Sequence, residues 1–298
     1  MPTHLVWFRA DLRLHDNIAL AAACRSEHAR VLALFIATPG QWQQHDMAPR
    51  QAAYLCSHLN ALQRSLAEKG IPLIYKEVSD FTAQLSAVQE VCQQNDVTHL
   101  FYNYQYEFNE QQRDRELERI LGNVECQGFD DSVMLAPGSV MTGNREMYKV
   151  FTPFKNAFIK RLKEALPECV AAPSARGECV NDLPELTFDY PQQAYDHSLF
   201  PADEKAAIAQ LRQFCKTGAA AYEARRDFPA IEGTSRLSAC LALGVLSPRQ
   251  CLHRLLAEQP QALEGGAGSV WLNELIWREF YRHLMTYHPE LCKHRPFI

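Results

Sequence analysis

The chain has 298 residues, of which 47% are hydrophobic and 22% charged, and its formal net charge is −5. This composition is typical of a globular protein and excludes a disordered, collagen-like or low-complexity chain. The weakly acidic total argues against a nucleic-acid packaging protein but does not exclude a local basic groove. Residues 199–298 carry 12 Lys and Arg against 10 acidic residues, so we expect any polyanion partner on that half.

The length predicts two domains, because single hydrophobic cores stop growing at roughly 250–300 residues. The ten cysteines include no C-x-x-C pair, so we expect reduced thiols in a cytoplasmic protein. The N-terminus lacks the layout of a signal peptide, and no apolar run approaches the roughly 20 residues that span a membrane. We further expect a monomer, no membrane association and no metal site.

The first 130 residues alternate between two hydrophobic periods. Short apolar runs bounded by polar residues predict buried strands at 5–8, 31–36, 72–75, 99–102 and 124–126. Helical periodicity predicts helices at 50–69, 80–94 and 110–121, with Gly70 ending the first. This alternation indicates an α/β domain over residues 1–135, built on a doubly wound parallel (Rossmann-like) sheet.

Residues 136–200 break that alternation. The proline-rich stretch 171–201 predicts a long surface connection after a short helix at 154–166. From residue 201 to 298 only helices are predicted, at 203–215, at 249–257 after Ser247 and Pro248, and at 268–287. The second part is therefore predicted to be all-α.

Charged residues follow the first predicted strand, where residues 7–17 include Arg9, Asp11, Arg13 and Asp16. In a doubly wound sheet, loops at the carboxyl ends of strands line the ligand crevice, so one interpretation is a ligand-binding network. The alternative is a structural salt-bridge cluster where strand meets helix. The spacing of the residues leaves both interpretations open.

Five aromatic residues alternate with amides and carboxylates at 101–110, after the fourth predicted strand. A planar, amide-bearing ligand would stack on such rings and be held by Asn109 and Glu110. The alternative is an aromatic edge that packs beneath a neighbouring domain.

Residues 233–238, Gly-Thr-Ser-Arg-Leu-Ser, combine hydroxyls with Arg236 at a predicted helix start. Free backbone N–H groups and a nearby guanidinium favour a phosphate site, and the alternative is a plain helix cap.

The last predicted helix carries two of the four tryptophans. At 100° per residue, one face presents Trp271, Glu274, Arg278 and Tyr281, and an adjacent face presents Trp277, Phe280 and Leu284. An aromatic stripe is usually core, but buried unpaired charges are costly, so this mixture favours a cleft for a flat polar ligand.

Taken together, these segments resemble the DNA photolyase/cryptochrome family along essentially the whole chain, and residues 141–154 extend the match. The resemblance is strongest to the bacterial folate-type cyclobutane pyrimidine dimer photolyases. It implies a deoxyribodipyrimidine photo-lyase acting on UV-damaged DNA, in which light-excited reduced FAD lends an electron that opens the dimer. It also implies a 5,10-methenyltetrahydrofolate antenna that passes excitation energy to the flavin.

The resemblance also implies roles for single residues. The positions that match the family's FAD site are Tyr222, Thr234, Ser235, Arg236, Leu237, Ser238, Trp271, Glu274 and Arg278. Those that match the folate site are His45, Asn109, Glu110, Cys292 and Lys293. The expected DNA contacts are Arg226, Glu274, Trp277, Arg278 and Tyr281.

Glu274 and Trp277 are the expected catalytic residues: the resemblance puts the Glu274 carboxylate on the base edges of the dimer and the Trp277 ring against its face. Such parts suit a base that is extruded from the duplex, stacked and read at its edge.

The sequence stops at Ile298, whereas family members continue with the second half of the helical domain. We therefore expect an incomplete FAD-binding domain, without the family's tryptophan relay and part of its DNA groove. Two hypotheses accompany repair: a cryptochrome-like blue-light sensor and a non-catalytic folate-binding fragment. Glu274 and Trp277 favour repair.

Overall fold

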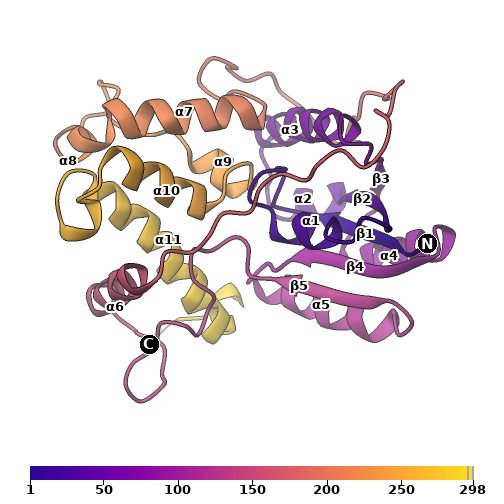
Figure 1. The fold of residues 1–298 in the computed structure, drawn as a ribbon, viewed down its shortest axis with the longest axis horizontal. Helices are drawn as coiled ribbons and strands as arrows, with labels where there is room; N and C mark the ends of the chain where they lie inside the picture. Colours follow the sequence, from indigo (N-terminus) through magenta and orange to yellow (C-terminus); the bar gives the residue numbers. More distant parts are fainter. Residues whose placement is uncertain (294, 297–298) are drawn as a thin grey trace.

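A five-stranded parallel sheet forms the first part of the molecule (Figure 1). The computed structural model describes residues 1–293 and 295–296. The strands are β1 Thr3–Phe8, β2 Arg30–Ala37, β3 Leu73–Glu77, β4 Val97–Asn103 and β5 Glu125–Phe129. Their order is β3-β2-β1-β4-β5, so all five predicted strands and the doubly wound fold are confirmed.

The central strand β1 is buried along its whole length. Its Trp7 pairs with Leu34 of β2 on one side and with Tyr102 of β4 on the other. Val6 belongs to the core on one face of the sheet, and Leu5 belongs to the core on the opposite face. A strand covered on both faces needs a continuous hydrophobic run, which is the pattern that revealed it in the sequence.

Helices cover both faces of this sheet. The core on one face includes residues of α1 (Ile18–Ala23) and α3 (Pro49–Ala67), and the other includes residues of α4 (Phe81–Gln94) and α5 (Phe108–Ile120). The three longer helices are confirmed predictions. The short helices α1 and α2 (Pro39–Gln44) were not predicted, because six residues carry less than two turns of periodicity.

The connection between the two halves contains no helix or strand over residues 165–203 and runs along the sheet domain (Figure 1). Hydrogen bonds nevertheless hold it in place, as where Arg176 N donates to Lys69 O at 2.8 Å. Gly70 has a φ of +70°, and a Cβ there would lie 2.8 Å from the Gly177 nitrogen. Glycine is therefore required at position 70, because any other residue would be strained by the positive φ and would also clash with the connection at Gly177.

The second part is helical, as predicted, and no strand follows β5 within the described residues. Its elements are α7 Glu204–Thr217, η1 Ala219–Ala221, α8 Tyr222–Arg225, α9 Ser238–Ala242, α10 Pro248–Glu258, η2 Ala262–Glu264, α11 Ser269–Tyr287 and η3 Pro289–Lys293. Asp203 and Ser247 cap α7 and α10 with their side chains. These caps explain why both helix starts were readable in the sequence.

Helix α6 (Phe151–Glu164) lies before the connection in the chain but packs against α11 (Figure 1). Its buried side chains are Phe154, Phe158 and Leu162, which follow helical spacing. Across the described residues, none of the helices combines the length and apolarity needed to cross a bilayer.

Candidate functional site

The nine positions that match the family's FAD site line a single cavity of about 480 Å³, which we call the α11 cavity. Its walls come from α8, α9, the loop before α9 and one face of α11. The lining residues are Tyr222, Thr234, Ser235, Arg236, Leu237, Ser238, Leu241, Ala242, Trp271, Glu274, Leu275, Arg278 and Arg282. Sequence reasoning missed Arg282, which lies one turn beyond Arg278 on the same face of α11.

The loop before α9 supplies the polar wall of the α11 cavity. Helix α9 begins at Ser238, as the helix-start prediction required. Arg236 has a left-handed φ of 53° and pairs with Glu232 at 3.2 Å. Within the described chain, the Thr234 hydroxyl makes no hydrogen bond, while Gln210 of α7 donates to the Ser235 carbonyl at 2.9 Å. The loop thus presents a hydroxyl without a partner and a guanidinium whose ion pair is exposed, and both groups could bind an anion.

The opposite wall is the face of α11 that carries Trp271 and Glu274. Trp271 is buried, and its ring lies 5.0 Å from that of Phe214. Glu274 accepts a hydrogen bond from Arg226 Nη1 at 2.5 Å. Two expected DNA contacts therefore pair with each other, and both remain partly exposed. Of the two, only Glu274 lines the cavity.

Arg278 joins the α11 cavity to the loop that follows β5. Its Nη1 donates to the Ser132 carbonyl at 2.6 Å. Burial lowers the pKa of the Arg278 guanidinium to about 10, so it still carries its charge at neutral pH. A fixed cation in a half-buried wall attracts an anionic ligand more strongly than one on the surface.

Two buried residues that sequence reasoning missed hold the same loop. The Glu279 carboxylate accepts from Met134 N at 2.8 Å, and His283 Nε2 donates to Leu135 O at 2.9 Å. Burial raises the pKa of Glu279 to about 7 and lowers that of His283 to about 4. The spacing of residues 278, 279 and 283 on α11 contains no signal for this, because their partners are backbone groups of a distant loop.

Trp277 lies outside the α11 cavity, on the side of α11 that faces α6. Its ring is stacked on Phe151, with centroids 3.5 Å apart and planes at 6°. Tyr281 lies 5.7 Å from Trp277 and is 54% exposed. The two faces predicted for this helix are therefore real, but Tyr281 belongs with Trp277 rather than with the cavity.

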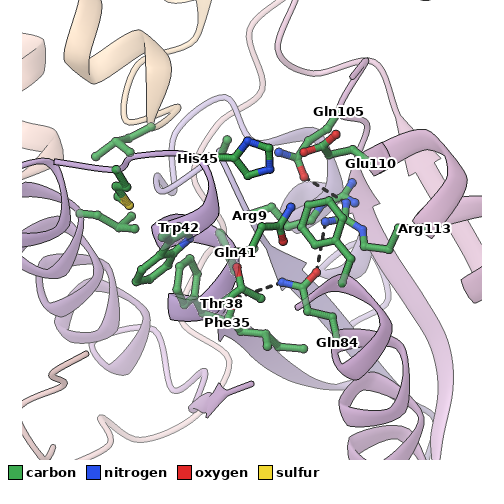
Figure 2. A pocket seen from close by; sticks show the side chains of 17 residues that line it. Arg9, Phe35, Thr38, Gln41, Trp42, His45, Gln84, Gln105, Glu110 and Arg113 are labelled. Carbon is green, nitrogen blue, oxygen red and sulfur yellow. Dashed lines mark hydrogen bonds between the residues drawn. The ribbon is translucent and has the colours of Figure 1, made fainter. Parts of the chain in front are cut away.

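A second cavity of about 320 Å³, which we call the sheet cavity, lies at the carboxyl ends of β1 and β2 (Figure 2). Trp42, Gln41 and Gln84 line it together with Arg113, which donates to Gln105 at 3.0 Å. The Gln41 Oε1 atom is buried and has no partner within the described residues. An aromatic wall with an unpaired amide oxygen suits a flat ligand that donates hydrogen bonds.

The five expected folate residues do not meet in one cavity. His45 and Glu110 line the sheet cavity, and burial, together with nearby Glu107, raises the pKa of the Glu110 carboxyl. Asn109 is exposed in the first turn of α5. Cys292 and Lys293 lie in η3, which contacts α5. The Lys293 Nζ atom lies 3.5 Å from the centre of the Phe108 ring.

The aromatic segment 101–110 is mainly a packing element. Tyr102 is fully buried and donates to Glu118, and Tyr106 donates to Asp130 at 2.7 Å. From this segment only Gln105 and Glu110 reach the sheet cavity. These two rings therefore pack within the sheet domain, so their contacts do not confirm the expected packing beneath a neighbouring domain.

A third, smaller cavity of about 230 Å³ lies between the other two and shares lining residues with both. Ala10, Gln105 and Glu110 also line the sheet cavity, whereas Ala242 and Arg282 also line the α11 cavity. The three cavities thus form a series along the boundary between the sheet and the helical half.

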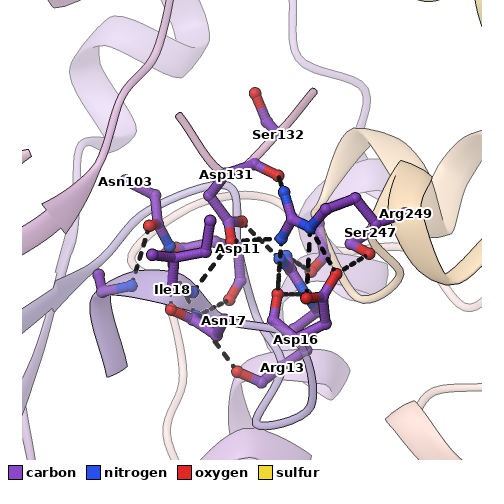
Figure 3. A network of polar contacts seen from close by, with 12 residues as sticks. Asp11, Arg13, Asp16, Asn17, Ile18, Asn103, Asp131, Ser132, Ser247 and Arg249 are labelled. Atoms are coloured by element: carbon purple, nitrogen blue, oxygen red, sulfur yellow. Dashed lines mark hydrogen bonds and ion pairs between the residues drawn. The ribbon is translucent and has the colours of Figure 1, made fainter. Parts of the chain in front are cut away.

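The charged segment after β1 forms a buried ionic network with residues of the helical half (Figure 3). Arg13 pairs with Asp131 at 2.5 Å, and Arg249 pairs with Asp131 at 2.9 Å and with Asp16 at 3.0 Å. All four side chains are at most 4% exposed, so they are closed to a ligand. Arg13 and Asp16 therefore follow the structural interpretation of this segment, whereas Arg9 lines the sheet cavity and Asp11 lines the third cavity.

The sequence model of the DNA photolyase family matches residues 4–173, more than half of the chain. The deoxyribodipyrimidine photo-lyase of Escherichia coli K12 is 71% identical across 100% of this chain. The chain spans 63% of the length of that relative.

Solved structures agree with the sequence match. A bacterial class III photolyase from Agrobacterium tumefaciens is 26% identical, with a TM-score of 0.76 over 98% of this chain and 60% of its own. A cryptochrome from Synechocystis shares the fold, with a TM-score of 0.83 at 24% identity over 97% of this chain and 62% of its own. On the family match and these likenesses, the chain belongs to the DNA photolyase family.

Proposed function

We propose that this chain forms the antenna domain and one wall of the flavin site of a deoxyribodipyrimidine photo-lyase, which repairs cyclobutane pyrimidine dimers in UV-damaged DNA. The observation that carries the proposal is the gathering of all nine matched FAD positions around the α11 cavity. The name of the Escherichia coli relative supports the same reaction. When bound, reduced FAD would supply the light-driven electron that opens the dimer and would recover it afterwards.

The donors of the α11 cavity fit the diphosphate and flat rings of FAD. Arg236, Arg278 and Arg282 present three guanidiniums to it, and Arg282 forms no ion pair within the described residues. Arg236 and the Thr234 hydroxyl would bind the diphosphate, since charge-assisted hydrogen bonds are the strong ones. Trp271, which is buried against Phe214, would offer a fixed apolar edge to the ring system.

On the DNA side, Glu274 and Arg226 would change partners. In the structure they hold each other at 2.5 Å. We propose that a DNA phosphate attracts Arg226 and frees the Glu274 carboxylate for the N–H groups of the dimer. The exchange costs little, because partly exposed ion pairs contribute only about 0–1 kcal/mol.

For the antenna we propose 5,10-methenyltetrahydrofolate, held near the start of α5. The Glu110 carboxylate and the unpaired Gln41 oxygen accept hydrogen bonds, as the amino and amide groups of a pterin require. Asn109 and the η3 residues Cys292 and Lys293 lie outside the sheet cavity, where they would contact the rest of the folate. The polar cavity that adjoins both larger cavities supports a site at this boundary.

The test is to reconstitute the purified chain with FAD and with the folate, then to assay repair of a dimer-containing oligonucleotide under blue light with a reductant. Binding of FAD with light-dependent loss of dimers supports repair. Binding of FAD without repair favours a light sensor, and binding of folate alone favours a non-catalytic fragment. A chain that binds neither cofactor contradicts the proposal.

A further inference from the structure

The Phe151 side chain covers Trp277, the ring that the proposed function assigns to the extruded dimer. The two rings overlap face to face, 3.5 Å apart at 6°. Tyr281 lies 5.7 Å from Trp277 at 23°, and Phe280 meets its edge at 81°. A base that stacks on Trp277 must therefore displace one of these rings.

Phe151 is the ring that is most easily exchanged for a base. Aromatic side chains prefer offset or edge-on contacts with centroids about 4.5–7 Å apart, because two negative faces repel in a full overlap. The contact between Phe151 and Trp277 has the disfavoured geometry. Stacking of a nucleic-acid base on an aromatic side chain contributes about 1–3 kcal/mol for any of the bases, against about 0.5–1.5 kcal/mol for a well-arranged pair of aromatic side chains.

The backbone that carries Phe151 is the uncapped first turn of α6. Val150, at the N-cap position, provides no side-chain hydrogen bond and is 62% exposed. Thr152 and Pro153 are also exposed, whereas Phe154 is completely buried and fixes the remainder of the helix. An uncapped first turn with few buried contacts opens at low cost, and the buried turn behind it provides the hinge.

From these contacts we infer that Phe151 controls access to Trp277 by competing with an incoming base for its stacking face. The inference rests on the proposed function, because it takes Trp277 as the platform for the dimer. An extruded dimer gains enough stacking to displace Phe151. An undamaged base must also be unpaired and unstacked from the duplex, so it leaves Phe151 in place.

The experiment measures the affinity of the full chain for a duplex oligonucleotide with one cyclobutane thymine dimer and for its undamaged copy. Removal of the competing ring in F151A should tighten dimer binding by about two- to tenfold, the equivalent of one aromatic stack. The undamaged duplex should bind as before. The matched control V150A removes a neighbouring exposed side chain that has no ring contact, and it should leave both affinities unchanged.

Two further variants separate competition from other effects. In a W277A background, F151A should no longer tighten dimer binding, because the Trp277 ring for which Phe151 and the dimer compete has been removed. V150S adds a capping side chain that holds the first turn closed, so it should weaken dimer binding. Weaker dimer binding by F151A, or tightening that persists without Trp277, would overturn the inference.

A DNA-free measurement distinguishes failure of this inference from failure of the proposed function. Quenching of Trp277 fluorescence by acrylamide, obtained as the difference from a W277F variant, should increase in F151A and not in V150A. Unchanged quenching overturns the inference even if dimers bind. If no variant prefers the damaged duplex, the proposed dimer site is wrong, whereas increased quenching would still establish that Phe151 covers Trp277.

Discussion

Arg249 of α10 donates to Asp131, which follows β5, at 2.9 Å, and the same guanidinium pairs with Asp16 at 3.0 Å. One side chain of the helical half therefore pairs with two buried carboxylates at the carboxyl edge of the sheet, and Arg13 supplies the second positive charge (Figure 3). The same residue donates to the backbone of the loop that follows β5, at Asp131 O and Val133 O. The loop that follows β5 therefore accepts hydrogen bonds from, or donates them to, side chains of two helices: Arg249 of α10, and Arg278 and Glu279 of α11.

We expect Arg249→Met to destabilise the chain by about 3–5 kcal/mol, because it leaves two buried carboxylates short of a partner. The measurement is the free energy of unfolding in urea at neutral pH. Arg254→Met is the matched control, since Arg254 lies on the same helix in a partly exposed pair with Glu258. If the two variants lose the same free energy of unfolding, the buried network stabilises the chain no more than the partly exposed pair of Arg254 and Glu258.

The pH dependence of stability should report Glu279. Burial raises its pKa to about 7, so the folded chain holds a proton that the unfolded chain releases above a pKa of about 4.5. Glu279 should therefore lower stability as the pH rises from about 4.5 to 7, by about 3 kcal/mol at most. Burial lowers the pKa of His58 and of His283 to about 4, so these two imidazoles raise stability over the same range. The contribution of Glu279 is the difference between the urea profiles of the two chains, and Glu279→Gln should gain stability with pH more steeply than the parent.

The control for Glu279 is Glu223→Gln, which removes an exposed acid that forms no ion pair within the described residues. Its profile should keep the slope of the parent chain. Asp131 acts in a different range: burial alone would raise its pKa, but Arg13 and Arg249 hold it below its ordinary value. The stabilisation by Asp131 is lost only as the pH falls below about 4. The effects of Asp131 and Glu279 on the free energy of unfolding therefore appear in different pH ranges.

Local sequence signals predicted those strands and helices along which hydrophobic residues recur at a regular spacing. The buried strands and the long helices α3 and α11 were readable because apolar residues recur along each of them. The partners of Asp16 were not readable, since Arg249 lies 233 positions along the chain and no local pattern links them. The two faces of α11 followed from helical spacing, but only the fold showed that Phe151 covers Trp277.

Arg236→Ala should weaken FAD binding by about 10- to 100-fold, the loss expected for a hydrogen bond to a charged phosphate. Its partner Glu232 is exposed, so the variant should unfold like the parent chain. Quenching of flavin fluorescence on titration gives the dissociation constant. Arg225→Ala is the control, because Arg225 does not line the α11 cavity; loss of binding in this variant instead would point to a different phosphate site.

Arg226→Ala should weaken binding to damaged and undamaged DNA alike and reduce the salt dependence of the affinity. One phosphate contact fewer lowers the slope of log K against log salt by about 0.9 for a duplex. The stability of the fold should not change, since the Arg226 pair with Glu274 is partly exposed. An unchanged slope would indicate that Arg226 stays paired with Glu274 when DNA is bound.

Gly244→Ala tests a close approach between the two halves, where Gly244 meets the backbone of Ala10 and Asp11. Gly244 has a φ of +64°, and a Cβ there would lie 2.0 Å from the Ala10 carbonyl oxygen, closer than any real contact. Arg13 also donates to the Gly244 carbonyl at 2.9 Å, so a shift of Gly244 would also move the buried ionic network to which Arg13 belongs.

Gly265→Ala is the matched control, because Gly265 has a φ of +84° but nothing within 4 Å of an added Cβ. We expect Gly265→Ala to cost about 1–2 kcal/mol through backbone strain alone, and Gly244→Ala to cost clearly more in urea unfolding. If both variants unfold at the same denaturant concentration, the two halves are not packed as tightly at Gly244 as the structure indicates.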